Sequence, residues 1–365
     1  MRKILILPFL QMPSGHHQVA DALSTYLKAI DNRLEIKKVD IFHYTSRLAE
    51  QASTYLYLKA IKLMPSVYGL LYRYNACRVY ETNKRYFFYE QLFLKRMKKL
   101  IVQENPDIII CTHCLPSYLL NLLKRNGYLS VPVINAYTDY FINTVWGISD
   151  IDLHLAPSDE MKHFLESRAV SPEKIAVTGI PVHPHITQKM RKIVKKVSPF
   201  HVLVSGGHLG VGLVEKLFDV TNLSGKIKYF VLCGKNQKLF RKITSFHTSI
   251  LEPISYISSR PEMNRLYEQM DLVLSKPGWI TISECFQKEL PLCLLKALPG
   301  QEEWNRHYLL KEKLTIPIVG EQMEKSLLLF LEDEKAKQQF QQRLSAYVSE
   351  LENINVVLQE FLIKH

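Results

Sequence analysis

The chain has 365 residues, a length that favours two domains. Hydrophobic residues make up 47% and charged residues 22%, as in an ordinary soluble globular protein. The net charge of +12 predicts an anionic partner, such as nucleic acid, an anionic membrane surface or a phosphorylated ligand. No apolar stretch approaches the roughly 20 residues that a membrane-spanning helix needs, so the sequence predicts no such helix.

The six cysteines are scattered and mostly lie in apolar runs, which predicts reduced, buried thiols and not a disulfide framework. Cys111 and Cys114 form one C-x-x-C pair, and a single pair without a second is weak support for zinc, so we predict no metal site. We therefore expect a cytoplasmic protein, with peripheral attachment to the inner face of the cell membrane.

Short apolar runs alternate with helical patterns nearly throughout the chain. In the first half the expected strands are 3–9, 34–42, 107–113, 132–138, 152–158 and 174–179. In the second half they are 201–207, 228–235, 271–276, 290–295 and 315–320. Continuous apolar runs separated by helices are typical of parallel sheets covered on both faces. The sequence predicts an α/β fold with two doubly wound Rossmann-like domains facing a cleft.

A basic, proline-closed segment separates the two series of strands. We place the first domain at 1–183, the linker at 184–199 and the second domain at 200–345. Two helices are expected over about 321–362. The end of the chain, 346–365, is predicted to be a C-terminal helix, with packing back on the first domain as an open alternative.

Two strands are followed by glycine turns that open a helix. The first turn contains Gly15 and then His16, and the second contains Gly206, Gly207 and Gly210. Glycine allows close approach of the backbone to a ligand, and the N–H groups of a helix start favour anions. Many such turns are only tight connections, but three glycines in five residues exceed what a turn requires.

Two further turns follow in the second domain. The first, SKPGWITISE, places Lys276 and Gly278 at a strand end and Thr281 and Glu284 on the next helix. The Glu284 carboxylate is suited to accept hydrogen bonds from two ribose hydroxyls, although a lone glutamate on a helix is more often simply solvated. The second, PGQEEWN, contains the residues Gly300, Gln301, Glu302 and Asn305, and its amide beside a carboxylate suits sugar hydroxyls.

Taken in order, these motifs resemble a known family. SGGHLG, VLCGKN with Lys235 and Asn236, SKPGWITISE and PGQEEWN are similar to the donor domain of the monogalactosyldiacylglycerol synthase and processive diacylglycerol glucosyltransferase family. That family is related to the glycosyltransferase that forms lipid II. In the first half, SGHHQVADAL, NAYTDYFINTVW and VTGIPVHP also resemble family motifs. The resemblance covers nearly the whole chain.

The resemblance implies a GT-B glycosyltransferase that transfers a hexose with inversion of its anomeric configuration. Its second domain would bind a UDP-sugar, and its first domain a diacylglycerol-type lipid acceptor, with Gly15, Tyr140 and Trp146 on the acceptor side. No cofactor or catalytic metal is implied, in agreement with the lack of Asp-x-Asp near the donor motifs. Lys235 and the helix starts would supply positive potential instead.

The sequence departs from the family pattern at a few positions. His208 and Trp279 stand where the family has glycines, and Asn143 stands where it has histidine. Trp279 would either stack on a ring of the donor or acceptor, or fill space that a normal donor uses. These departures keep open a transferase with a soluble or specialised acceptor, and a non-catalytic regulator that binds sugar nucleotides.

The catalytic candidates follow from the chemistry of an inverting transfer, which needs a base for the acceptor hydroxyl. His16 matches the family's motif histidine and begins a helix at the end of the first strand, so it is the leading base. Asp139 is the second candidate, as an alternative base or as the group that orients His16. Without the motif, the simpler interpretation of His16 and of Asp139 would be that each one only caps a helix or loop.

Residues 54–100 combine many basic and aromatic side chains with only two acidic ones. This composition suits the headgroup layer of an anionic membrane, and we expect binding there to involve Lys95, Arg96, Lys98 and Lys99. Aromatic and basic side chains also suit single-stranded nucleic acid, but no recognised module accompanies them, so we predict no nucleic-acid partner. An ordinary helical insertion whose aromatics pack in the core is the simpler alternative.

Overall fold

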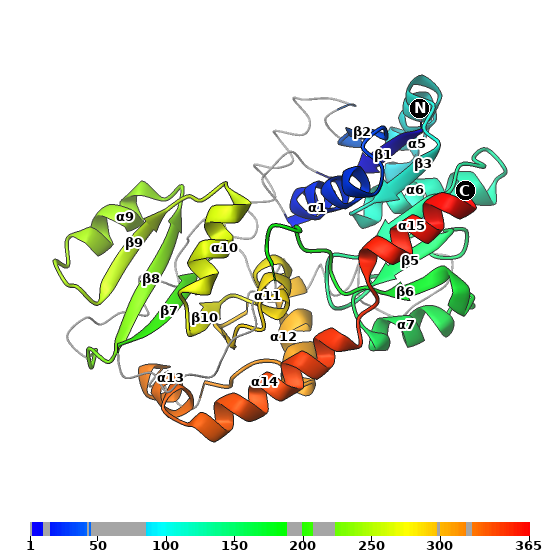
Figure 1. The fold of residues 1–365 in the computed structure, drawn as a ribbon. Coiled ribbons are helices and arrows are strands. Elements are labelled where there is room, and N and C mark those ends of the chain that lie inside the picture. Colours follow the sequence, from blue (N-terminus) through cyan, green and yellow to red (C-terminus); the bar gives the residue numbers. More distant parts are fainter. Residues whose placement is uncertain are drawn as a thin grey trace. The chain divides into compact units, whose positions relative to one another are not determined.

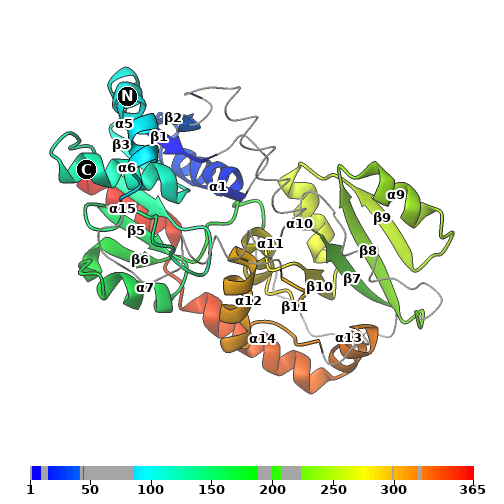
Figure 2. The same ribbon diagram turned by 180° about the vertical axis from the view of Figure 1, so that it is seen from behind.

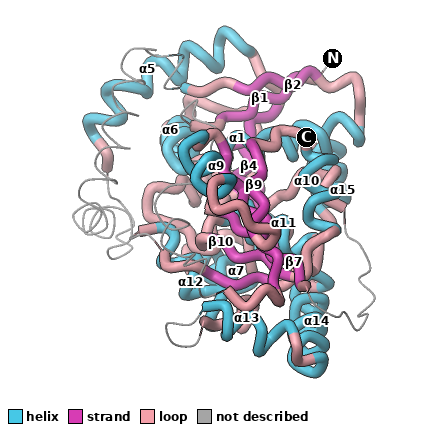
Figure 3. Tube along the Cα trace, turned by 90° about the vertical axis from the view of Figure 1, so that its left-hand side faces the viewer, coloured by secondary structure: helices cyan, strands magenta, loops and turns pink. Residues whose placement is uncertain are grey.

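The structure is a computed structural model and describes residues 2–9, 15–41, 44, 85–187, 199–206, 223–297, 300–318 and 323–365. The chain forms two compact units. The first comprises Met1–His183, Leu298–Gln301 and Leu351–His365, and the second comprises Pro184–Ala297 and Glu302–Glu350. Each unit is an α/β layer structure in which helices flank a sheet of strands (Figures 1 and 3).

The first unit is built on a six-stranded parallel sheet in the order β2-β1-β3-β4-β5-β6. Its strands are β1 (Lys3–Leu7), β2 (Glu35–Lys38), β3 (Ile108–Cys111), β4 (Val133–Ala136), β5 (Leu153–Ala156) and β6 (Ile175–Val177). Its helices are α1 (Gly15–Ile30), α5 (Phe87–Glu104), α6 (Cys114–Arg125), α7 (Asp159–Glu166), the short 3-10 helix η2 (Pro172–Lys174) and α15 (Ile354–Lys364).

Two central strands of the first unit, β1 and β3, are buried on both faces, whereas the edge strand β2 is mostly exposed. Ile4 and Leu5 of β1 point to opposite sides of the sheet, yet both are fully buried, as are the four residues of β3. Helices therefore cover both faces of the sheet at these two strands, which explains why β1 and β3 lack a polar alternation.

The last helix of the chain belongs to the first unit, where α15 packs against α1. Glu352, just before α15, exchanges two hydrogen bonds with Val177 of β6, at 2.7 and 2.8 Å. Leu358 is buried on α15 and contributes on the order of 1.5–3 kcal/mol through burial. The second unit runs to Glu350, beyond the predicted boundary at 345.

The second unit is built on a five-stranded parallel sheet in the order β11-β10-β7-β8-β9. Its strands are β7 (Phe200–Ser205), β8 (Ile227–Gly234), β9 (Leu251–Ser255), β10 (Leu272–Ser275) and β11 (Leu292–Leu294). Its helices are α9 (Gln237–Thr244), α10 (Arg260–Glu268), α11 (Trp279–Gln287), α12 (Gln301–Lys311), α13 (Met323–Leu331) and α14 (Glu334–Ser349).

The two doubly wound sheets confirm the predicted fold class, but three details of the prediction are wrong. The sequence prediction omitted β9, which lies at the edge of its sheet (Figures 1 and 2). Of the predicted strand 315–320 the structure describes 315–318, and among these residues only Ile316 pairs, through an isolated bridge to Cys293. Three helices, α13, α14 and α15, replace the two expected near the end of the chain.

The strand order places a switch point in each sheet. In the first unit the chain reverses direction across the sheet between β1 and β3, and in the second between β7 and β10. Ligands of doubly wound folds bind beyond the carboxyl ends of strands at such points. Among the described helices, none is both long and apolar enough to cross a membrane.

Candidate functional site

The switch point of the first unit is occupied by His16. Gly15 and His16 open α1 after β1, while Thr112 follows β3 and Thr138 follows β4. The Nδ1 atom of His16 lies 2.8 Å from the carbonyl oxygen of Thr112 and 3.1 Å from Oγ1 of Thr138. A carbonyl can only accept a hydrogen bond, so Nδ1 carries the proton and donates it. The basic lone pair of this neutral imidazole then belongs to Nε2.

The surroundings of His16 keep its ring uncharged. Burial lowers the pKa of His16 to about 4, although its hydrogen bond to the Thr112 carbonyl works in the opposite direction. The hydroxyl of Thr112 also donates to the carbonyl of His16 at 3.0 Å, which ties the start of α1 to the end of β3. At neutral pH the imidazole is thus available to accept a proton.

A second histidine, His113, lies against His16 and was not predicted as part of this site. The two ring centroids are 4.7 Å apart in an edge-to-face arrangement. Nδ1 of His113 accepts a hydrogen bond from the Leu115 amide at 3.1 Å and so caps α6. The His113 ring also stacks on Phe9, with centroids 4.6 Å apart. Burial holds the pKa of His113 well below its usual value, so it also stays neutral.

Asp139 lies directly after Thr138 and is buried. Burial raises the pKa of the neighbouring Cys114 thiol to about 12, and the negative charge of Asp139 adds to this shift. Asp139 is therefore close to the start of α6, at the same edge of the sheet as His16. The contact of Thr138 with His16, in contrast, was not anticipated from the sequence.

Tyr140 and Trp146, predicted on the acceptor side, are largely buried, with 3% and 8% of their surfaces exposed. The Trp146 ring packs edge-on against Tyr137, with centroids 4.6 Å apart. Asn143, which stands at the family's histidine position, accepts a hydrogen bond from the Val145 amide at 3.0 Å. The segment 139–146 is thus held in a fixed conformation by its own polar contacts and by the core.

The switch point of the second unit is formed by the ends of β7 and β10. The amide of Lys276 donates to the carbonyl of Ser205 at 3.4 Å, which links the two strand ends directly. Gly278 then caps α11 from the extended region, and Trp279 is the first residue of that helix. The buried Asn305 side chain of α12 donates to the Pro277 carbonyl at 3.2 Å. Asn305 therefore holds the Lys-Pro-Gly turn in place.

The next strand, β8, brings Lys235 and Asn236 to the same edge. Asn236 caps α9 by accepting a hydrogen bond from the Leu239 amide at 3.0 Å. The ammonium of Lys235 lies 5.4 Å from the centroid of the Tyr256 ring, a cation–π contact just beyond β9. A cation at a helix start beyond the sheet is suited to a diphosphate.

Glu284 is buried on α11 and is held by two partners that sequence reasoning missed. One carboxylate oxygen accepts from Nη1 of Arg260 at 2.9 Å, and the other accepts from the Tyr267 hydroxyl at 2.7 Å. Burial raises the pKa of Glu284, while the positive charge of Arg260 opposes that shift. Arg260 opens α10, which follows β9, so it too approaches from the carboxyl edge of the sheet. This pair fixes the orientation of the carboxylate.

The structure describes only some of the remaining residues that were predicted to bind the donor. Gly207, His208 and Gly210 lie outside the described residues, and Gly206 directly follows β7. Thr281 is half-buried on the first turn of α11. The φ of Gly300 is 108°, a value that favours glycine, and Gln301 and Glu302 begin α12 directly after it.

The chain is similar in sequence to known glycosyltransferases. Residues 16–182 match the model of the family described as monogalactosyldiacylglycerol (MGDG) synthase. The chain is 40% identical over 354 residues to a Bacillus subtilis (strain 168) protein named "Uncharacterized glycosyltransferase YkoN", covering 96% of this chain and 94% of that one. It is 29% identical over 318 residues to a processive diacylglycerol beta-glucosyltransferase of Bacillus pumilus (strain SAFR-032), covering 84% and 80%.

The fold has counterparts among solved structures. The crystal structure of Acinetobacter baumannii MurG superimposes with a TM-score of 0.63 at 12% identity, and the match covers 100% of both chains.

Proposed function

The chain belongs to the monogalactosyldiacylglycerol synthase family of glycosyltransferases, and from that premise we propose that it moves a hexose from a UDP-sugar to a diacylglycerol-type lipid with inversion. The observation that carries this proposal is His16, a neutral histidine at the switch point of the first unit. The name of the Bacillus pumilus relative supports the acceptor class.

In the proposed reaction, Nε2 of His16 takes the proton from the acceptor hydroxyl. The acceptor oxygen forms a bond to the anomeric carbon while the bond from that carbon to the diphosphate oxygen breaks. UDP departs with the electron pair, and attack from the face opposite the leaving group inverts the anomeric centre. Thr112 keeps the proton on Nδ1, so that the reacting nitrogen remains basic.

The second unit is the proposed donor site. Lys235 follows β8 and Lys276 follows β10, the two strands that flank β7 in a Rossmann-like sheet, and the amides at the start of α11 come shortly after Lys276. Such groups stabilise the negative charge that develops on a leaving diphosphate. We propose transfer without a metal or other cofactor, and treatment with a chelator should leave the rate unchanged.

Peripheral attachment to the inner face of the cell membrane is a further part of the proposal. Residues 54–84 lie outside the described residues, but α5 is described. Spacings of three and four residues bring Phe88, Leu92, Lys95, Lys99 and Val102 onto one exposed face of α5. Exposed apolar and cationic side chains on one helix face suit the headgroup layer of an anionic bilayer.

Attachment is tested by co-sedimentation with anionic vesicles. Lys95→Glu combined with Lys99→Glu should reduce the bound fraction, and high salt should do the same. Lys238→Glu combined with Arg241→Glu makes the same change of charge on α9 and should have less effect. Equal loss of binding in both double variants would reject α5 as the attachment surface.

The central experiment offers labelled UDP-sugars, one at a time, with diacylglycerol liposomes. We expect labelled glycolipid from at least one UDP-hexose. Inversion at the anomeric centre gives a β-linked product, which is identified by its anomeric proton coupling in NMR. His16→Gln should bind UDP normally but lose about 10²–10⁴ in rate. Transfer to none of the sugars, with UDP still bound, would favour the non-catalytic sugar-nucleotide regulator.

A further inference from the structure

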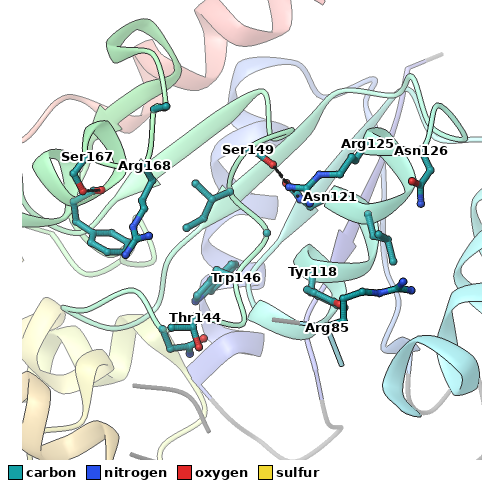
Figure 4. Close-up of a pocket in the computed structure, with 16 residues that line it drawn as sticks. Arg85, Tyr118, Asn121, Arg125, Asn126, Thr144, Trp146, Ser149, Ser167 and Arg168 are labelled. Atoms are coloured by element: carbon teal, nitrogen blue, oxygen red, sulfur yellow. Dashed lines mark hydrogen bonds between the residues drawn. The ribbon is translucent and has the colours of Figure 1, made fainter. Parts of the chain in front are cut away.

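A cavity of about 700 Å³ in the first unit is lined in part by Trp146, which we place on the acceptor side, so it belongs to the function already proposed (Figure 4). The second unit contains a buried charge that the proposed reaction does not use. Lys288 is the C-cap residue of α11, and none of its side chain is exposed. Its amide donates to the carbonyl of Glu284 at 3.0 Å, so it lies one helical turn beyond that residue.

All three hydrogens of the Lys288 ammonium group have acceptors. The Nζ atom lies 2.7 Å from the carbonyl oxygen of Thr187, 2.8 Å from Oδ1 of Asn264 and 3.3 Å from Oε1 of Glu268. An ammonium group has three donors and no acceptor, so these contacts satisfy it. Two of the acceptors lie on α10, and the third lies in the segment by which the chain enters the second unit.

The burial of this charge indicates a role in geometry and not in stability. Removal of an ammonium group from water costs several kcal/mol, and apolar packing of the same volume is often as stable as a buried ion pair. A methionine has a similar length and would need no polar partners at this position. What Lys288 adds is a fixed point at which α10, α11 and the entering segment are held together.

The same two helices hold the Glu284 carboxylate (Figures 1 and 2). Arg260, Asn264 and Glu268 are spaced by four residues and share one face of α10. Glu284 and Lys288 share one face of α11 in the same way. Arg260 bonds to Glu284 at 2.9 Å at one end of this contact, and Lys288 bonds to Asn264 at the other. Lys288 therefore helps to set the position of the helix that carries Arg260.

The segment that connects the two units is tied at both ends. His183, where the first unit ends, has its Nε2 atom 3.2 Å from Oγ1 of Thr25 on α1. Both backbone groups of Thr187 are bonded, because its amide donates to Oδ1 of Asn264 at 3.1 Å and its carbonyl accepts from the buried ammonium group. Only residues 184–186 lie between the two ties, so the position of Thr187 depends on the contact between α10 and α11.

We propose that Lys288 is a positioning residue of the donor site, which couples nucleotide binding at Glu284 to the attachment of Thr187. A nucleotide that orders Glu284 orders one end of the shared network, so the attachment of Thr187 at the other end then costs less conformational entropy. Such coupling is reciprocal, so a break at Lys288 weakens nucleotide binding although Lys288 does not contact the nucleotide. The inference rests on the proposed donor site at Glu284.

The first test is a double-mutant cycle on the affinity of the full chain for UDP, measured by calorimetry. Lys288→Met should weaken UDP binding about fivefold or more when Glu284 is present. In the Glu284→Ala background the same substitution should change the affinity by less than about twofold, because the group through which it acts is gone. Lys124→Met is the matched control, since it removes a largely buried lysine that pairs with Asp152 in the first unit, and UDP affinity should stay unchanged.

The second test measures hydrogen exchange at the Thr187 amide by mass spectrometry. UDP should slow this exchange in the wild type. In Lys288→Met the exchange should be faster without UDP, and UDP should no longer slow it. Asn264→Ala removes another member of the network at a partly buried position and should weaken UDP binding with the same dependence on Glu284. That variant keeps the test decisive if Lys288→Met does not fold.

Two results would overturn the proposal. One is an equal loss of UDP affinity from Lys288→Met with and without the Glu284 carboxylate, which would reduce Lys288 to a contribution to general stability. The other is exchange at Thr187 that does not respond to UDP in the wild type. Unchanged UDP affinity in Glu284→Ala is a distinct result, because it rejects the donor-site assignment itself and this inference with it.

Discussion

The buried environment of His16 predicts an unusual pH profile for sugar transfer. Its pKa of about 4 lies below the ordinary histidine value of 6.5, a difference that corresponds to about 3 kcal/mol favouring the neutral ring. At about pH 5.5 a histidine with the lowered pKa is still roughly 97% neutral, whereas an ordinary histidine is only about 10% neutral. At about pH 5.5 an enzyme that uses the buried histidine as its base should therefore keep its activity, whereas an enzyme that uses an ordinary histidine would lose about nine-tenths of its activity.

The assay measures kcat/KM for transfer to diacylglycerol at about pH 7.5 and about pH 5.5, because kcat/KM reports the pKa of the free enzyme. We expect nearly equal values, with a large loss in His16→Gln at both pH values. A tenfold fall between the two pH values in the wild type, with an apparent pKa near 6.5, would refute the neutral-histidine argument. Near wild-type turnover in His16→Gln would exclude His16 as the base and favour Asp139.

Three further predictions concern the donor site and the stability of the units. Glu284→Ala should weaken UDP binding by about 1–3 kcal/mol, since it removes the carboxylate that Arg260 orients, and unchanged calorimetric affinity would reject its role. Gly147→Ala should lower the free energy of unfolding by about 1–3 kcal/mol, measured in urea, because its Cβ would lie 2.4 Å from Cβ of Asn121. Burial lowers the pKa of His154 to about 3, so the unfolded chain binds more protons below about pH 6.5 and stability should fall as the pH drops from there towards 3. His154→Phe should flatten that dependence in thermal unfolding, and an unchanged slope would contradict the assignment.

The sequence predicted the central strands well because they are buried on both faces. The residues of β3 and β10 form short apolar runs that few other structures accommodate. The edge strand β9 escaped prediction because only one neighbour pairs with it, so half-exposed residues and Pro253 are tolerated there. Local composition carries little information about a strand of that kind.

The candidate sites show the same limit at the level of side chains. The position of His16 at a helix start was predictable from its own turn. Its contacts with Thr112 and His113 depend on β3 lying beside β1, which is a property of the strand order. Likewise, Glu284 was predicted as a ligand group, but its partner Arg260 comes from a different helix. Contacts between distant segments require the topology, which no single motif contains.

The placement of α15 has a consequence for the order of events during synthesis. The ribosome completes every strand of the first unit and then makes the whole second unit before α15 is translated. Until then the surface of α1 that α15 covers, and the Val177 groups that bond Glu352, remain exposed to solvent or to chaperones. The first unit therefore cannot be completed until the second unit has been translated, because its strands and α15 lie on opposite sides of the second unit in the chain.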